Sequence, residues 1–191
     1  MNNIFKLYLT KINPLIMKTI KFSAAVLTVI TLFSISSCNI EPVDSDLLGN
    51  LINPASVAGT YRMTAFNTGI PTDLNHDGTS STNQMLETTC FNGSIIVINP
   101  DGTFRATSKG VDISSSPSLT CFSDPDYTGT WTLNATVLKL TYIDTGVVVE
   151  ELFSVSGNKL LYSVPQGQVV GTTATNVPVF LTTSYNIVYT K

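Results

Sequence analysis

Residues 128–164 read TGTWTLNATVLKLTYIDTGVVVEELFSVSGNKLLYSV. Apolar and aromatic side chains alternate with polar ones through four runs, and this period of two is typical of half-buried β-strands. Asp144-Thr-Gly146 and Gly157-Asn158 separate consecutive runs with residues that form tight turns. The segment therefore predicts antiparallel strands that are joined by short hairpins.

The same pattern continues on both sides of this segment. Runs rich in Val, Ile, Thr and aromatic residues cover 57–66, 94–99, 103–107, 128–133, 137–143, 147–155, 159–164 and 179–190. Eight hairpin-linked strands predict an up-and-down barrel or a sandwich, and the barrel is favoured because closure leaves no unpaired edge. A single helical turn is expected near residues 83–87. The expected fold is all-β, an eight-stranded antiparallel barrel over residues 57–191.

The alternation also assigns side chains to the two faces of the barrel wall, and a shift of one residue would reverse a whole strand. In the first run, Ala65 shares the face of Tyr61, and Phe66 lies on the other face. The residues expected to point outward are Arg62, Thr132, Thr141 and Ser163, and those expected to point inward are Tyr61, Met63, Phe104, Trp131, Leu133, Leu140, Tyr142, Phe153 and Tyr162.

The first 37 residues have the layout of a secretory signal peptide. Lys18 and Lys21 precede an apolar run over residues 22–33, which small residues and Cys38 follow. This run has 12 residues, whereas a membrane-spanning helix needs about 20. We expect residues 1–37 to be a signal peptide, with Met17 as an alternative start of the chain.

Ile35-Ser-Ser-Cys38 resembles the lipobox of bacterial lipoproteins, in which acyl chains such as palmitate on the cysteine anchor the mature protein. The resemblance implies that Cys38 is lipidated; the alternative is a soluble secreted protein that is cut near Cys38. Residues 38–56 begin with an acidic, Pro-containing stretch and are expected to form a flexible tether. Asn39 does not match the Asp that often retains such lipoproteins in the inner membrane, so the outer membrane is favoured, on its periplasmic or its surface face.

The charge of the chain excludes nucleic acid as a partner. The net charge is −3 for the whole chain, but residues 38–191 hold 6 basic and 13 acidic side chains, a net of −7. Such a protein has no basic surface to hold a phosphate backbone.

Cys90 and Cys121 remain as a pair once Cys38 is assigned to the lipid. An exported domain meets an oxidising environment, so a disulfide is expected between them. Zinc binding by this pair is not expected, because His76 is the only histidine and zinc sites require four ligands.

Short motifs stand along the expected strands and turns: Gly59-Thr-Tyr-Arg-Met63, Asp73-Leu-Asn-His-Asp-Gly78, Glu87, Cys90, Asp101-Gly-Thr-Phe104, Cys121 and Gly129-Thr-Trp-Thr-Leu133. Together they resemble the lipocalin-like lipoproteins of Gram-negative bacteria. The resemblance implies an eight-stranded, calycin-type barrel, tethered to a membrane and usually without a known reaction. Tyr61 stands where lipocalins carry the Trp of their Gly-x-Trp signature, and the last strand has no Arg, so the resemblance does not extend to the ligand-transporting lipocalins.

The segment from Asp73 to Gly78 also matches the first half of a calcium-binding loop. Oxygen ligands at Asp73, Asn75 and Asp77 precede a Gly, as in an EF-hand. Gln84 stands at the twelfth position, where a bidentate Glu is needed, and Glu87 follows three residues later as a completing carboxylate. The alternative is a polar turn between strands. Calcium is the only cofactor that the sequence indicates.

Catalytic motifs are weak. His76 is the only candidate imidazole base, and neither a Gly-x-Ser-x-Gly elbow nor a phosphate-binding glycine motif is present. Glu150 and Glu151 are adjacent on one strand and point to opposite faces, so they cannot act as a pair. Glu151 shares the inward face; it is either a pocket carboxylate or, as the sequence favours, exposed at the end of its strand.

We therefore expect a membrane-tethered binding module of the cell envelope, without catalytic activity, that takes a small apolar ligand or a surface partner. The alternative is a structural or assembly lipoprotein with a filled barrel and no small ligand. A cavity inside the barrel would separate the two, because eight strands can enclose either a packed interior or one small ligand.

Overall fold

A computed structural model of the chain describes residues 52–113, 119–173, 175 and 177–191. The expected signal peptide, Cys38 and most of the expected tether lie outside the described residues. None of the helices within these ranges is long and apolar enough to cross a membrane.

The described residues form two short helices and eleven strands. The helices are α1 (Pro54–Val57) and α2 (Gln84–Glu87). The strands are β1 (Gly59–Thr72), β2 (Ser81–Asn83), β3 (Ile95–Ile98), β4 (Thr103–Thr107), β5 (Lys109–Asp112), β6 (Thr120–Ser123), β7 (Tyr127–Asn134), β8 (Val137–Asp144), β9 (Val147–Ser156), β10 (Lys159–Thr172) and β11 (Pro178–Thr190).

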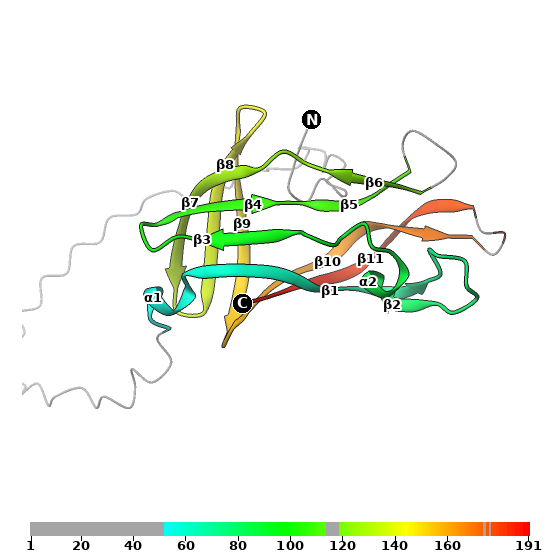
Figure 1. Cartoon of the computed structure of the whole chain (residues 1–191), viewed down its shortest axis with the longest axis horizontal. Coiled ribbons are helices and arrows are strands. Elements are labelled where there is room, and N and C mark those ends of the chain that lie inside the picture. The colour runs from blue at the N-terminus through cyan, green and yellow to red at the C-terminus, as the bar shows by residue number, and fades with distance from the viewer. Residues whose placement is uncertain (1–51, 114–118, 174, 176) are drawn as a thin grey trace, which may run out of the picture. The chain divides into compact units, whose positions relative to one another are not determined.

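The main sheet closes on itself as a barrel (Figure 1). Its strands are hydrogen-bonded in the order β11-β10-β9-β8-β7-β4-β3-β1-β2, and an additional pairing of β11 with β1 completes the ring. Every pairing is antiparallel. Eight strands form the ring and correspond to the eight runs expected from the sequence. Strand β2 pairs with the second half of β1, between Asn67 and Thr72. The expected all-β, eight-stranded barrel is confirmed.

The alternation of faces holds in most of the barrel. All nine residues expected inside are buried or packed against the core, although Leu133 and Tyr162 are only half-buried. Of those expected outside, Arg62, Thr132 and Ser163 are exposed and Thr141 is half-buried.

The first strand departs from the simple alternation. The register of β1 against β11 shifts between Met63 and Ala65, which marks a β-bulge. A bulge adds one residue to a strand and reverses the faces that follow it. Phe66 and Thr68 are therefore buried and Ala65 is only half-buried, so the expected placement of Ala65 and Phe66 was wrong.

Cys90 and Cys121 form the expected disulfide, with Cα atoms 5.0 Å apart and a sequence separation of 31. The bond ties the segment after α2 to β6, which pairs with β5 in a separate two-stranded sheet. The sequence interpretation did not include α1, β2, β5 or β6. It did include the turn at α2, where the Asn83 side chain accepts a hydrogen bond from the Met85 N–H as the N-cap.

Candidate functional site

One end of the barrel, here called the closed end, is sealed. Trp131 Nε1 donates a hydrogen bond of 2.9 Å to the Asn99 carbonyl, and the Tyr61 hydroxyl donates one of 2.9 Å to the Val57 carbonyl of α1. Lys191 Nζ donates to two backbone carbonyls beside the same helix. These contacts hold α1 and the C-terminal Lys191 at this end of the barrel. The closed end carries the hairpin turns β3–β4, β7–β8 and β9–β10.

The opposite end, here called the wide end, carries the β8–β9 turn, α2, β2 and the β5–β6 sheet. At this end β9 and β10 are no longer hydrogen-bonded to each other. Strand β10 pairs with β9 only from Lys159↔Ser156 to Leu161↔Ser154, although β9 runs back to Val147 and β10 continues to Thr172. Figure 1 shows the two strands diverging from their shared hairpin.

Inward-facing side chains beside this gap are partly accessible. Val149 on β9 and Tyr162 and Val164 on β10 are half-buried and pack against the core, whereas Phe153 and Leu160, nearer the hairpin, are fully buried. The stretch in which β9 and β10 are not paired and three inward side chains are half-buried is called the β9–β10 opening below; the rings of Phe153 and Tyr162 pack across its hairpin end with centroids 5.3 Å apart.

Glu151 lies inside the barrel between these regions. Its residue is 6% exposed, and its backbone is paired with that of Leu140. The Tyr142 hydroxyl donates a hydrogen bond of 2.9 Å to Oε1, but Oε2 is buried and accepts none from any described residue. Burial raises the pKa of Glu151 to about 8, and the Tyr142 hydrogen bond opposes this only in part.

Five tyrosines interact with this carboxyl group, Tyr142 through its hydrogen bond and the others through the effect of the Glu151 charge; they are called the tyrosine cluster: Tyr127, Tyr142, Tyr162, Tyr185 and Tyr189. The rings of Tyr127 and Tyr142 are 5.5 Å apart. Burial raises the pKa of Tyr162 to about 12, with the Glu151 charge adding to the effect. Burial likewise raises the pKa of Tyr127, Tyr185 and Tyr189, again with a contribution from Glu151. These hydroxyls therefore stay neutral at physiological pH.

The sequence interpretation was wrong to favour an exposed Glu151. Strict alternation along β9 already placed it inward, so that signal was present. Its burial depends on the tyrosines of β10 and β11, which are brought over it only when the barrel closes. Tyr127 was missed because the expected strand began at residue 128.

The segment with the expected calcium ligands is a polar turn that uses its own oxygen atoms. The Asp73 carboxylate accepts hydrogen bonds from the Asp77 and Gly78 N–H groups at 3.1 and 3.0 Å. Asn75 donates to the Asp77 carboxylate at 3.0 Å. Glu87 is turned to the backbone, where Oε2 accepts from the Leu74 N–H at 3.1 Å. The structure thus brings Asp73, Asn75 and Asp77 together, while Glu87 contacts the same turn through the backbone of Leu74.

Among the described residues, no group of three or more His, Cys, Asp or Glu side chains is arranged to hold a metal ion. His76 has a φ of 60° and Gly78 a φ of 86°, both left-handed conformations that suit a tight turn. Calcium binding at this segment is still a prediction. The alternative interpretation, a polar turn between strands, agrees with the hydrogen bonds of the structure.

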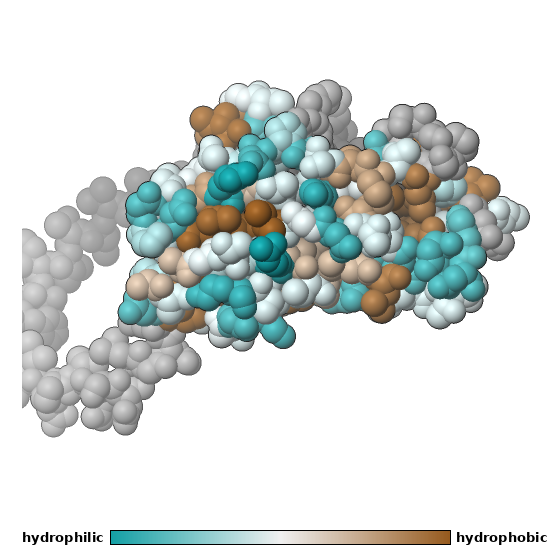
Figure 2. Space-filling view, in the orientation of Figure 1, coloured by the Kyte–Doolittle hydropathy of each residue, from teal (hydrophilic) through white to brown (hydrophobic). Residues whose placement is uncertain are grey.

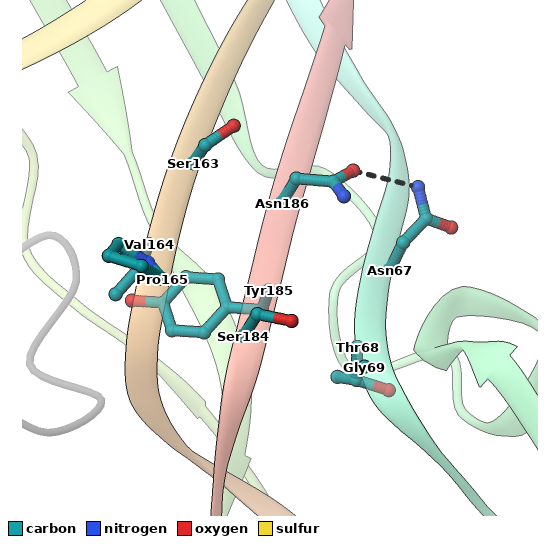
Figure 3. A pocket seen from close by; sticks show the side chains of 9 residues that line it. All are labelled: Asn67, Thr68, Gly69, Ser163, Val164, Pro165, Ser184, Tyr185 and Asn186. Atoms are coloured by element: carbon teal, nitrogen blue, oxygen red, sulfur yellow. Dashed lines mark hydrogen bonds between the residues drawn. The ribbon is translucent and has the colours of Figure 1, made fainter.

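A hollow of about 300 Å³ lies where β1, β10 and β11 adjoin, next to the β10 register shift between Val164 and Gly167. Its lining includes Val164 and Tyr185, so it reaches the tyrosine cluster from outside (Figure 3). Asn67 donates a hydrogen bond of 3.0 Å to Asn186 across β1 and β11 at this place. The hollow thus borders the tyrosine cluster at Tyr185.

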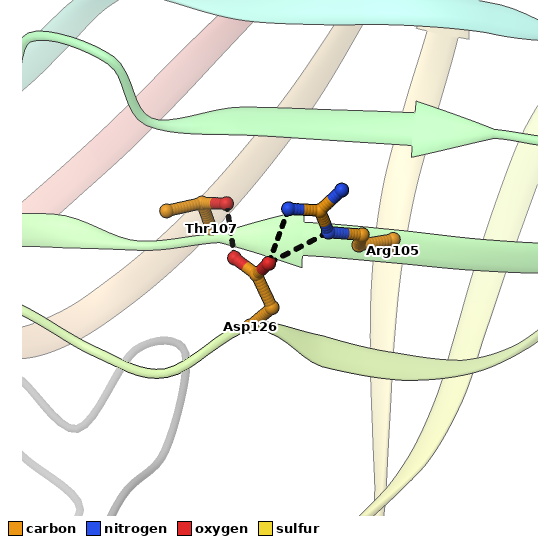
Figure 4. A network of polar contacts seen from close by, with 3 residues as sticks. All are labelled: Arg105, Thr107 and Asp126. Carbon is orange, nitrogen blue, oxygen red and sulfur yellow. Dashed lines mark hydrogen bonds and ion pairs between the residues drawn. The ribbon is translucent and has the colours of Figure 1, made fainter.

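The outer surface holds two other features. Arg105 and Thr107 on β4 both bond the Asp126 carboxylate just before β7, and these bonds lower the pKa of Asp126 (Figure 4). The three side chains satisfy one another and join neighbouring strands. On the face shown in Figure 2, apolar side chains form separate groups between polar ones. Ile143 and Val148 are exposed beside a shallow hollow of about 560 Å³ over β7 and β8.

Comparison with known proteins agrees with this architecture. The family model described as a lipocalin-like domain matches residues 57–162, which span β1 through the first part of β10. No curated protein and no solved structure matches the chain. The matched region is more than half of the chain and contains Glu151 and the whole of β9. The motifs that indicated this resemblance all lie within it. The chain belongs to the lipocalin-like domain family.

Proposed function

We propose that this protein is a non-catalytic binding module that takes a small apolar ligand through the β9–β10 opening into the wide end of its barrel. The observation that carries the proposal is the parting of β9 and β10 after Leu161↔Ser154, which leaves inward-facing apolar side chains half-exposed. A lipocalin-like barrel is a fold typical of binding modules.

The energetics favour an occupant at this place. Val149, Tyr162 and Val164 keep part of their apolar surface in water, and covering it contributes about 25 cal/mol per Å². The backbones of β9 before Ser154 and of β10 after Leu161 are not paired with each other. The hydrogen bonds of Trp131 and Tyr61 at the closed end support access from the wide end.

The cellular setting is part of the proposal. The signal-peptide layout and the lipobox-like Ile35-Ser-Ser-Cys38 support a lipid on Cys38 that holds the barrel at the cell envelope, in the outer membrane. Intact mass of the membrane-extracted protein should show acyl chains on a chain that begins at Cys38. A mature protein without lipid, or one that begins elsewhere, contradicts the anchor.

Photo-labelling tests the binding site. The full chain in a non-ionic detergent is exposed to a diazirine-bearing fatty alcohol, and the labelled peptides are mapped. Label should concentrate in residues 147–164 and be competed by the unlabelled alcohol. Val149→Trp, which fills the opening from the inner face, should reduce the label at least about tenfold. Val148→Trp, on the outer face of the same strand, should not.

Both variants should melt within a few degrees of the wild type, so a loss of label reports on the opening and not on unfolding. Label found only on outer-face residues such as Ile143 contradicts the binding function. That result supports the alternative, a structural lipoprotein whose barrel is filled by its own side chains.

A further inference from the structure

Glu151 is a buried carboxyl group with half of its hydrogen-bonding capacity unused. Tyr142 occupies Oε1, while Oε2 has no partner among the described residues. No described Lys or Arg forms an ion pair with it; the pairs Arg105–Asp126 and Lys139–Glu150 lie on the outer surface. A carboxylate taken out of water without a counter-ion is strongly destabilised, and any cation that reaches it is strongly attracted in a medium of low dielectric constant.

The surroundings of Glu151 favour a cation. The faces of aromatic rings carry negative charge density and attract ammonium groups. Tyr142 is hydrogen-bonded to the carboxyl group, and the ring of Tyr127 lies 5.5 Å from that of Tyr142. Neutral hydroxyls of this cluster can also accept hydrogen bonds from an ammonium group. A buried carboxylate combined with aromatic rings is the combination that recognises organic cations.

The wide end carries further negative charges besides that of Glu151. Asp124 and Asp144 lie close enough to Tyr127 for their charges to raise its pKa, together with that of Glu151. Residues 38–191 carry a net charge of −7. A negative field around an opening draws in cations and repels fatty acids and other anions.

We propose that Glu151 anchors an organic cation, a single ammonium group on an apolar body, which sits among the tyrosine cluster with its apolar part in the β9–β10 opening. This inference rests on the proposed function and names its ligand class. The ammonium donates to Oε2 while Tyr142 keeps Oε1, so both oxygens of the carboxylate become satisfied. A neutral alcohol can offer only the hydrogen bond and none of the charge.

Two matched probes test the anchor: 2-phenylethylamine, which carries the ammonium, and 2-phenylethanol, which has the same apolar body without charge. Their binding to the full chain in a non-ionic detergent is measured by titration calorimetry at pH 8, with a detergent blank. The amine should bind at least about tenfold more tightly than the alcohol. In Glu151→Gln this preference should disappear, with the affinity for the alcohol unchanged within about twofold.

Glu150→Gln is the matched control. Glu150 is the neighbouring residue, points outward, and pairs with Lys139 at 2.8 Å, so its removal changes the total charge equally without touching the interior. The preference for the amine should survive in this variant. Equal binding of both probes to the wild type, or a preference for the amine that persists in Glu151→Gln, overturns the anchor. Either result leaves the binding function standing, because that function fails only if label at the opening is absent.

Discussion

The two ends of the barrel are built from the same strands but differ in hydrogen bonding and in the burial of their side chains. At the closed end Trp131, Tyr61 and Lys191 direct their polar atoms to backbone carbonyls, and Leu138 and Leu160 are fully buried. At the wide end the wall parts, inward side chains remain half-exposed, and a carboxylate oxygen lies buried without a partner. The polar groups of the closed end are thus satisfied by the chain itself. At the wide end, a ligand would cover exposed apolar surface and supply a partner for the buried oxygen. The closed end therefore contributes mainly to stability, and the wide end is where we propose that the ligand binds.

The largest expected effect is the response of the wide end to pH. The folded pKa of Glu151 is about 8, against 4.5 for an ordinary Glu, so between these values the folded protein holds a proton that the unfolded chain has released. Folding stability from this group is therefore complete below pH 4.5 and declines as the pH rises to 8, by about 5 kcal/mol over the interval.

Denaturant unfolding at several pH values checks this. Glu151→Gln should remove the decline, so that its advantage over the wild type is greatest above pH 8. Glu150→Gln should keep the decline, because Glu150 is exposed. A wild type whose stability does not fall between pH 5 and 8 would mean that Glu151 is reached by water and that the two ends do not differ in this respect.

The next effect is the loss of the disulfide at the wide end. Replacing both Cys90 and Cys121 by Ser should lower the free energy of unfolding by about 4 kcal/mol, because the bond closes a loop of 31 residues. Urea titration measures the change. Reduction of the wild type should reproduce it. A change below about 1 kcal/mol would show that the wide end does not need a covalent tie and is better packed than the half-buried side chains indicate.

The smallest effect compares packing at the two ends directly. Leu138→Ala, at a residue with no exposed surface, should cost about 3 kcal/mol, since it leaves a cavity in a packed interior. Val149→Ala, at the β9–β10 opening, should cost less than about 1 kcal/mol. Thermal unfolding of both variants gives the comparison. Equal costs would mean that the wide end is as tightly packed as the closed end.

The closed end is also the part that the sequence describes better. The alternation around Trp131 and Leu140 predicts both strand and face, because it is a local property of hairpin-linked strands. The bulge after Met63 was not predictable in this way, since it arises from the pairing of β1 with β11, more than a hundred residues away. The site at Glu151 likewise depends on strands that are distant in sequence and meet only in the folded barrel. Alternation gives the direction of its side chain, but its burial and its tyrosine partners come from strands distant in sequence.

The pairing of β11 with β1 has a consequence for how the molecule is made. Arg62 meets Thr190 and Thr68 meets Tyr185, so the seam of the barrel joins the first strand of the ring to the last. Until β11 is synthesised and docked, β1 lacks its neighbour on that side and β10 lacks its longest one, and both present open edges on which other chains can assemble. Contacts so distant in sequence also slow the final closure. A lesion in residues 178–190 should therefore reveal itself first as aggregation of newly made chains, before any ligand is encountered.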